Sequence, residues 1–254
     1  MPMLQLEGGS IYYSVKGSGV PIIFIHPPVL TSANFQYQIE ELSKQFTVIT
    51  FDIRGHGNSS FSSEHITYPL IVQDIVKILD NLDIDKTFLC GYSTGGSIVL
   101  EFMQTFADRS LGGIVIGGMS ETRHLFLKCL IHLGIFFTRK DAVTFLAYVA
   151  AISNADTKKL FKKMVRESRK GNSKNIGQYY RYILQYNSTA QLKSIDLPVL
   201  LVYGVNDKPF HYYANLLQKK LPLQELVFID NVMHQVPTKA SDELNSLLKD
   251  FIRR

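Results

Sequence analysis

The stretch Gly91-Tyr92-Ser93-Thr94-Gly95-Gly96 says most about the fold. It lies between a short apolar run, Thr87 to Cys90, and a helical pattern from Ile98 to Phe106. A serine flanked by glycines at such a junction predicts a sharp strand-to-helix turn, because small neighbours let the backbone close and leave the serine oxygen exposed. The first amides of the following helix would point to the same place and favour negative charge there. We therefore expect Ser93 to be a nucleophile.

A serine hydroxyl needs a general base at neutral pH, and the base needs an acid to orient it. Asp207 and His234 each follow an apolar run in the last quarter of the sequence. Because parallel sheets bind ligands beyond the carboxyl ends of their strands, we expect Ser93, Asp207 and His234 to meet there as a catalytic triad. Asp230 and Glu121 remain alternatives to Asp207 as the orienting acid.

The runs on either side of this turn indicate the fold class. Continuous apolar runs rich in β-branched residues are typical of strands covered on both faces. Such runs occur at Pro21 to Ile25, Phe46 to Phe51, Thr87 to Cys90, Leu111 to Ile116, Pro198 to Tyr203 and Glu225 to Ile229. Amphipathic helical patterns alternate with them, at Thr31 to Lys44, Tyr68 to Leu82 and Ser241 to Ile252. This order predicts an α/β protein with a doubly wound, mostly parallel sheet, and Leu4 to Val15 predicts a hairpin at its edge.

The alternation stops between about Ser120 and Ser194, where only helical patterns are found. We therefore expect residues 120–194 to be a helical insertion, with a loop at Gly171 to Asn175, on a core formed by 1–119 and 195–254. From Ser120 to Ala190 the net charge is +9, whereas the rest of the chain carries −4. A solvated helix face explains this charge best. Attraction of an anionic substrate, or weak peripheral contact with an acidic membrane, are the alternatives.

Composition narrows the class of protein further. The lysines of the insertion lack an aromatic stacking platform or a known motif, so no nucleic-acid partner is expected. Cys90 and Cys129 are too few for a disulfide framework and lack metal-ligand spacing, so both are expected to be buried free thiols. With no signal-peptide pattern and no apolar run long enough to span a bilayer, we expect a cytoplasmic protein, monomeric or homodimeric, without an integral membrane segment.

The sequence resembles the α/β-hydrolase superfamily, in its branch of small lipase-like and esterase-like proteins, over nearly its whole length. Besides the serine turn, Asp52-Ile-Arg-Gly-His-Gly-Asn-Ser59 is similar to a D-x-R-G-x-G-x-S turn of that family. The resemblance implies that Arg54 and His56 belong to the scaffold. It also implies that the insertion is a cap over the active site. Its apolar residues could line a cavity, although most are expected to form the cap's own core: Phe126, Leu130, Phe136, Phe137, Phe145, Leu146 and Tyr148.

The resemblance also implies an oxyanion hole with one departure from the family pattern. The amide of Thr94, the residue after the nucleophile, would supply one donor. His26-Pro27-Pro28 stands where the family has His-Gly and then the residue that supplies the second donor. Pro28 has no N–H to donate, so the donor would be Val29, or the hole would be weaker.

These observations predict a serine hydrolase that acts on esters with small or medium apolar acyl or aryl groups, with no cofactor and no metal. Two alternatives stay open. The same triad could cleave C–C bonds of an anionic substrate, which a pocket lined by Arg123, Arg139 or Arg181 would favour. The chain could also be a ligand receptor or signalling protein with slow hydrolysis, which the proline at position 28 allows.

Overall fold

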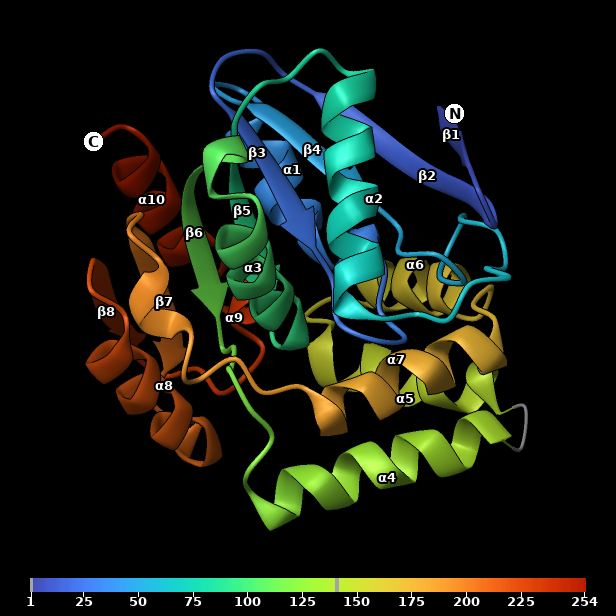
Figure 1. Ribbon diagram of the computed structural model, residues 1–254. Coiled ribbons are helices and arrows are strands. Elements are labelled where there is room, and N and C mark those ends of the chain that lie inside the picture. Colours follow the sequence, from blue (N-terminus) through green and yellow to red (C-terminus); the bar gives the residue numbers. More distant parts are fainter. Residues whose placement is uncertain (1, 140–141) are drawn as a thin grey trace.

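A computed structural model of the chain describes residues 2–139 and 142–254 and contains one eight-stranded sheet (Figure 1). Lys140 and Asp141, two of the charges counted in the insertion, lie outside the described residues. The strands are β1 (Met3–Leu6), β2 (Gly9–Lys16), β3 (Pro21–Ile25), β4 (Thr47–Phe51), β5 (Thr87–Tyr92), β6 (Ser110–Ile116), β7 (Val199–Gly204) and β8 (Gln224–Ile229).

The strand order is β1-β2-β4-β3-β5-β6-β7-β8. The hairpin β1–β2 is antiparallel and forms one edge, and the six strands from β4 to β8 run parallel. The inner strands β5 and β7, each with a neighbour on both sides, are buried along their whole length, which is why their sequences are apolar without alternation. The predicted α/β fold with a doubly wound, mostly parallel sheet is confirmed.

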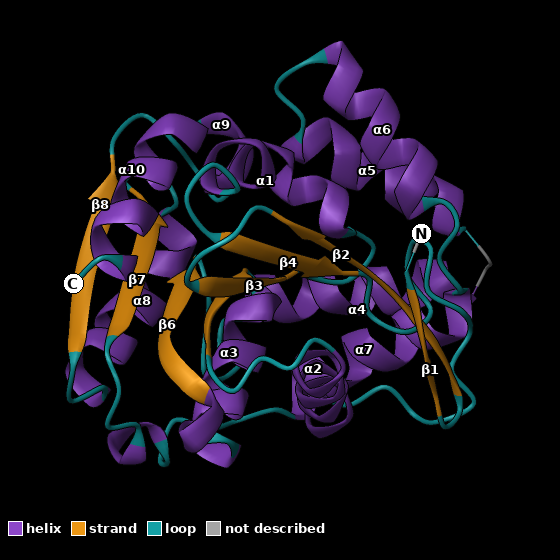
Figure 2. Ribbon diagram, turned by 90° about the horizontal axis from the view of Figure 1, so that it is seen from above, coloured by secondary structure: helices purple, strands orange, loops and turns teal. Residues whose placement is uncertain are grey.

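Helices cover both faces of the sheet (Figure 2). Side chains of α2 (Tyr68–Asn81), α3 (Thr94–Thr105) and α8 (Lys208–Lys220) pack in one apolar core. Side chains of α1 (Gln36–Leu42), which follows the short helix η1 (Ser32–Phe35), of α9 (Val236–Lys239) and of α10 (Ser241–Ile252) pack in the other. Two further short helices, η2 (Ala107–Arg109) and η3 (Leu192–Ser194), occur in connections.

Four helices lie beyond the carboxyl ends of the strands, below the sheet in Figure 1. They are α4 (Leu125–Arg139), α5 (Val143–Asn154), α6 (Lys158–Ser168) and α7 (Ser173–Gln185). The loop predicted at Gly171 to Asn175 is wrong in its second half, because α7 already begins at Ser173. The side chain of Asn172 accepts a hydrogen bond from the Asn175 amide and so caps this helix.

The expectation of two buried thiols holds for only one cysteine. Cys90 is buried in β5, but Cys129 is exposed on α4. The sequence of α4 is apolar on several sides of the helix, so it does not indicate which residues face solvent. In the structure, Cys129 lies on the exposed side of this helix. Within residues 2–139 and 142–254, none of the helices is both long and apolar enough to span a bilayer.

The turn after β4 is a buried polar scaffold. Arg54 is only 1% exposed, and its guanidinium donates to both carboxylate oxygens of Asp74 on α2, at 2.8 and 2.7 Å. The His26 ring after β3 accepts a hydrogen bond at Nε2 from the Ile53 amide, 2.9 Å away, and its centroid lies 5.3 Å from that of the tilted His56 ring. These contacts hold the chain after β3 and after β4 together beside the serine turn.

Burial lowers the pKa of His26 to about 4 and that of His56 to about 3, from 6.5. Both imidazoles therefore stay neutral in the folded protein at pH values where the unfolded chain takes up protons. The stability that this supplies is complete above pH 6.5, the ordinary histidine pKa, and is lost as the pH falls toward about 4 for His26 and toward about 3 for His56.

We therefore expect His56→Gln to weaken the loss of stability on acidification. Removal of one buried neutral imidazole should reduce the slope of unfolding free energy against pH by up to about 1.4 kcal/mol per pH unit below the ordinary histidine pKa. Urea unfolding between about pH 7 and pH 5 measures this slope. The exposed His65 offers the matched control, and His65→Gln should keep the wild-type slope. An equal slope in His56→Gln and the wild type would contradict the conclusion that His56 stays neutral in the folded protein.

Candidate active site

Ser93 lies at the junction of β5 and α3, with a left-handed backbone (φ 54°, ψ −121°). Such a conformation is costly for a residue with a side chain and persists only where its surroundings hold it. Neighbouring glycines make it possible. A Cβ atom on Gly91 would lie 2.2 Å from the Gly95 carbonyl oxygen, and one on Gly95 would lie 2.2 Å from that of Ile25. The predicted strand-to-helix turn is therefore present, with Ser93 half-buried at its tip.

The structure brings Ser93, His234 and Asp207 together. Asp207 follows β7 and His234 follows β8, so all three residues stand at the carboxyl edge of the sheet. His234 Nε2 lies 2.9 Å from Ser93 Oγ, and His234 Nδ1 lies 2.7 Å from Asp207 Oδ2. A carboxylate can only accept, so Nδ1 carries the imidazole proton and Nε2 is free to accept the proton of Ser93.

The two alternative acids lie elsewhere. Glu121 accepts hydrogen bonds from Thr189, at 2.9 Å, and from Tyr212, at 3.4 Å. Asp230 is exposed at the end of β8. Asp207, by contrast, is only 4% exposed, so its carboxylate is screened from water where it contacts the imidazole. Of the three candidates, Asp207 alone contacts His234.

Aromatic rings and a glycine that sequence reasoning missed surround His234. The ring centroid of Phe210 lies 4.1 Å from that of the imidazole, and the ring centroid of Tyr92 lies 5.3 Å from it. Gly117 has φ 55°, and a Cβ atom there would lie 2.9 Å from His234 Cε1. The Gly117-Gly118 pair directly after the β6 run was the available sequence signal, since glycine permits such close approach. These contacts restrict the imidazole to one orientation.

The oxyanion candidates Thr94, Val29 and Pro28 lie beside the serine, and each lines a cavity that Ser93 also lines. Thr94 is the first residue of α3, so its amide has no partner within the helix. Val29 has φ 70°, which is strained for a β-branched residue. Among the described residues, no hydrogen-bond acceptor is found for the Val29 amide. Within the described residues both amides are thus left without a hydrogen-bond acceptor, whereas Pro28 has no N–H.

Ser93 lines two cavities. The one under α5 has a volume of about 250 Å³, and the one under α4 and α7 has a volume of about 180 Å³. Pro27, Pro28 and Tyr180 contribute to both. The α5 cavity is lined further by Val29, Leu30, Tyr92, Leu146, Val149, Ala150, Ser153, Asn154 and His234. The α4–α7 cavity is lined further by Thr94, Met119, Leu127, Leu130, Ile131 and Ile183. Aliphatic side chains dominate both linings.

The expectation that most of the seven apolar residues 126–148 form the cap's own core is wrong. Five of them are exposed on α4 and α5: Phe126, Leu130, Phe136, Phe145 and Tyr148. Only Leu146 is buried, and Phe137 is half-buried. Both helices are apolar around most of their circumference, so their sequences do not indicate which side faces the core. Leu130 and Leu146 are the two that line the cavities beside Ser93.

The arginines proposed as a pocket for an anionic substrate lie away from Ser93. Arg139 and Arg181 line a separate cavity between α4 and α7, of about 270 Å³. Arg123 donates a hydrogen bond to the Tyr212 hydroxyl, 3.0 Å away. In the described part of the chain, no group of three or more His, Cys, Asp and Glu side chains could hold a metal ion.

The arrangement matches known proteins in fold and in part of the sequence. A family model described as the α/β hydrolase fold matches residues 20–137. The AB hydrolase superfamily protein YisY of Bacillus subtilis is 27% identical over 269 residues, which cover 96% of each chain. The 3-oxoadipate enol-lactonase 1 of Acinetobacter baylyi is 41% identical over 96 residues, 37% of this chain and 36% of that one.

Among solved structures, an esterase from Exiguobacterium antarcticum is similar with a TM-score of 0.89 at 19% identity, over 99% of both chains. That likeness covers the sheet, both helical layers and the four helices beyond the strand ends. Together with the matched family model and the full-length similarity to YisY, it shows that the chain has the α/β hydrolase fold.

Proposed function

We propose that the protein is a serine hydrolase that cleaves carboxylic esters with small or medium apolar groups. One observation carries the proposal: the continuous hydrogen-bonded series Ser93–His234–Asp207 ends in a serine oxygen between two apolar cavities. A half-buried serine next to an oriented imidazole is the arrangement that acyl transfer needs. The esterase and the enol-lactonase among the similar proteins support an ester or its cyclic form, a lactone, as substrate.

In the first half of the reaction, Ser93 Oγ attacks the ester carbonyl while His234 Nε2 takes its proton. Asp207 stabilises the imidazolium that forms. The same proton then passes to the departing alkoxide, which leaves as an alcohol, and the acyl group stays on Ser93. In the second half, His234 takes a proton from water, the resulting hydroxide attacks the acyl-enzyme, and Ser93 recovers its proton as the carboxylic acid leaves.

The negative oxygen of each tetrahedral intermediate needs hydrogen-bond donors. We assign these to the amides of Thr94 and Val29. The strained φ of 70° at Val29 supports this assignment, because strain of this kind concentrates where a site requires a particular backbone orientation. Val29 then takes the place of the donor that Pro28 lacks, and α3 adds the positive end of its dipole from the Thr94 side.

The two cavities suggest how the substrate is held. Ser93 lines both cavities, whereas α5 lines only one of them and α4 only the other, so one takes the acyl group and the other takes the alcohol group of the ester. The segment 120–194 then acts as a cap, because α4, α5 and α7 supply most of the apolar walls. Lysine and arginine are absent from the described residues of both linings, which favours a neutral ester over an anionic substrate.

Replacement of the nucleophile provides the first test. Ser93→Ala should lower kcat on chromogenic short-chain esters by about 10³-fold or more, because no other group forms the acyl-enzyme. Thr105→Ala removes an exposed hydroxyl at the far end of the same helix and should retain wild-type turnover. A fluorophosphonate probe should add one adduct to the wild type and none to Ser93→Ala, by mass spectrometry. Wild-type protein without turnover or labelling would exclude the proposed hydrolase and favour a receptor role.

Replacement of the acid tests the imidazole orientation. Asp207→Asn should lower kcat by roughly 10³–10⁴-fold with little change in KM, since an amide can donate to Nδ1 and so stabilise the wrong tautomer. Asp230→Asn serves as the control at the carboxylate that does not contact His234, and it should retain wild-type kcat. Similar losses in the two variants would contradict the assignment of Asp207.

Blocking each cavity tests how the two halves of the ester are held. Ala150→Phe fills the α5 cavity and Leu127→Trp fills the α4–α7 cavity. Each variant should lower kcat/KM by about tenfold or more for the longest substrates of one series only, either varied acyl groups or varied alcohols. The two variants should affect different series. If both affect the same series, the two cavities do not divide the substrate between them.

A further inference from the structure

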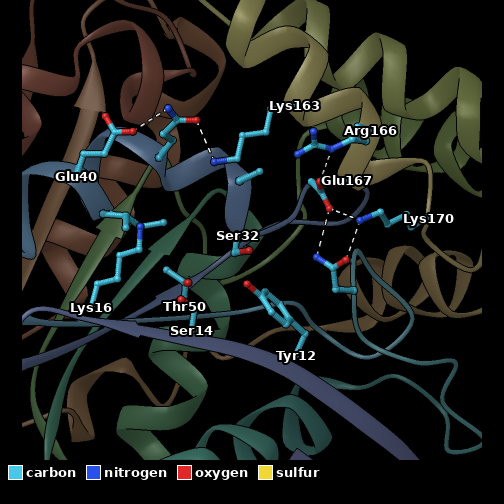
Figure 3. Close-up of a pocket in the computed structure, with 14 residues that line it drawn as sticks. Tyr12, Ser14, Lys16, Ser32, Glu40, Thr50, Lys163, Arg166, Glu167 and Lys170 are labelled. Atoms are coloured by element: carbon cyan, nitrogen blue, oxygen red, sulfur yellow. Dashed lines mark hydrogen bonds and ion pairs between the residues drawn. The ribbon is translucent and has the colours of Figure 1, made fainter. Parts of the chain in front are cut away.

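A polar cavity, of about 280 Å³, lies between the sheet and α6 (Figure 3). Its floor carries the hydroxyl-bearing side chains Tyr12 and Ser14 of β2 and Thr50 of β4. The helices η1 and α1 form one wall, and α6 with the turn after it forms the other. No residue of this lining belongs to the linings of the two cavities beside Ser93. The cavity is therefore separate from the proposed active site.

The charges around this cavity are unequal. Four basic side chains and two acidic ones line it: Lys16, Lys163, Arg166, Lys170, Glu40 and Glu167. Glu167 is shared by two of the cations, because it accepts hydrogen bonds from Arg166 Nε and from Lys170 Nζ. Among the residues that the structure describes, no carboxylate lies within ion-pair distance of Lys16 or Lys163.

Lys163 is the most buried of these cations. It is half-buried, and its ammonium donates one hydrogen bond, to Gln36 Oε1 at 3.0 Å. The amide of Gln36 in turn donates to Glu40 Oε1 at 2.8 Å, so an amide separates the ammonium from the nearest acid on α1. Burial lowers the pKa of Lys163; the charge of Glu40 opposes this shift, and the nearby charge of Lys16 adds to it. An ammonium has three donors, so this one can still take an anionic ligand.

We propose that the cavity binds a phosphate dianion, carried by a small molecule or by a lipid headgroup, between Lys16 and Lys163, with the hydroxyls of Ser14 and Thr50 as further donors. Lysine ammonium groups bind phosphate as point charges, and neutral hydroxyls complete the shell of a tetrahedral oxyanion. The ligand would supply the negative charge that no carboxylate supplies to Lys16 and Lys163. The volume admits a phosphate with a short polar group, in the size range of small-molecule sites.

The position of the cavity links this ligand to the proposed active site. Lys16 belongs to β2 of the sheet, whereas Lys163 belongs to α6, so a dianion between them joins the two parts. Helix α6 packs against α5, where the rings of Phe161 and Tyr148 lie 6.0 Å apart. Residues of α5 line the larger cavity beside Ser93. A bound phosphate therefore holds one wall of that cavity against the sheet, and it stabilises the folded state by mass action.

Calorimetric titration with inorganic phosphate and with glycerol phosphate, at constant ionic strength, tests the site in the intact chain. The double variant Lys16→Gln with Lys163→Gln should raise Kd for phosphate by about tenfold or more, as expected on loss of hydrogen bonds from charged groups. The matched control, Lys159→Gln with Lys162→Gln, removes the same charge from exposed positions of α6 and should change Kd by less than about twofold. If both double variants raise Kd for phosphate equally, the binding reflects only the general attraction of positive charge for phosphate, and the proposal is overturned.

A second readout locates the ligand without any variant. Partial acetylation of the wild type, followed by peptide mass spectrometry, reports the reactivity of each lysine. Phosphate should protect Lys163 and leave Lys159 unprotected; equal labelling of Lys163 with and without phosphate would overturn the proposal. This measurement stands even if the double variant fails to fold. Neither readout uses ester hydrolysis, so failure here and failure of the proposed function are distinguishable.

Two probes distinguish a soluble phosphate monoester from a lipid headgroup as the ligand. Binding of glycerol phosphate, lost in the Lys16→Gln, Lys163→Gln variant, supports a soluble phosphate monoester. Binding to phosphatidylcholine vesicles that contain phosphatidic acid, with the same loss and without binding of glycerol phosphate, supports a lipid headgroup. If neither probe binds the wild type, the proposal is wrong.

Discussion

The backbone turn at Ser93 is the constraint on which the arrangement of the site depends. Its left-handed conformation is held from both sides: the Ser93 amide donates to the Ile116 carbonyl of β6 at 2.7 Å, and Gly95 packs against the Ile25 carbonyl of β3. The serine oxygen consequently stands beyond the strand ends, at the N-terminus of α3. The strained backbone of Ser93 persists because three neighbouring strands and a helix hold this one residue in place.

The imidazole meets that oxygen only because the sheet is parallel. His234 lies 141 residues from Ser93 and 27 residues from Asp207 along the chain, yet hydrogen bonds connect all three. Parallel strands end at one edge, so the segments after β5, β7 and β8 are brought side by side there. Gly117, after β6, completes the arrangement by leaving room for the imidazole where any Cβ atom would collide with it.

The four helices beyond the strand ends have two different chemical surroundings. On the side of Ser93, α4, α5 and α7 present aliphatic side chains to the two cavities. On the opposite side, α6 presents lysine and arginine to a hydroxyl-lined floor on the sheet. The excess positive charge of the sequence between Ser120 and Ala190 is thus concentrated in part on one helix face, away from the serine. This separation would let neighbouring helices hold the proposed neutral substrate and the proposed anionic ligand.

The sequence by itself determined the elements whose signals are local. Uninterrupted apolar runs rich in β-branched residues, such as Pro21 to Ile25, identified the strands that are buried on both faces. The apolar stripe of Tyr68 to Leu82 identified α2, because a helix buried on one side repeats its apolar residues every three or four positions. It also singled out Ser93, Asp207 and His234, because each follows a strand and carries a reactive group.

Only the tertiary structure decided which acid contacts His234, which side of α4 faces solvent, and that Gly117 and Phe210 enclose the imidazole. The tertiary structure likewise decided that Lys16 and Lys163, which are far apart in the sequence, line the same cavity. Each of these depends on side chains from distant segments that meet across the sheet, and short-range periodicity carries no information about such meetings.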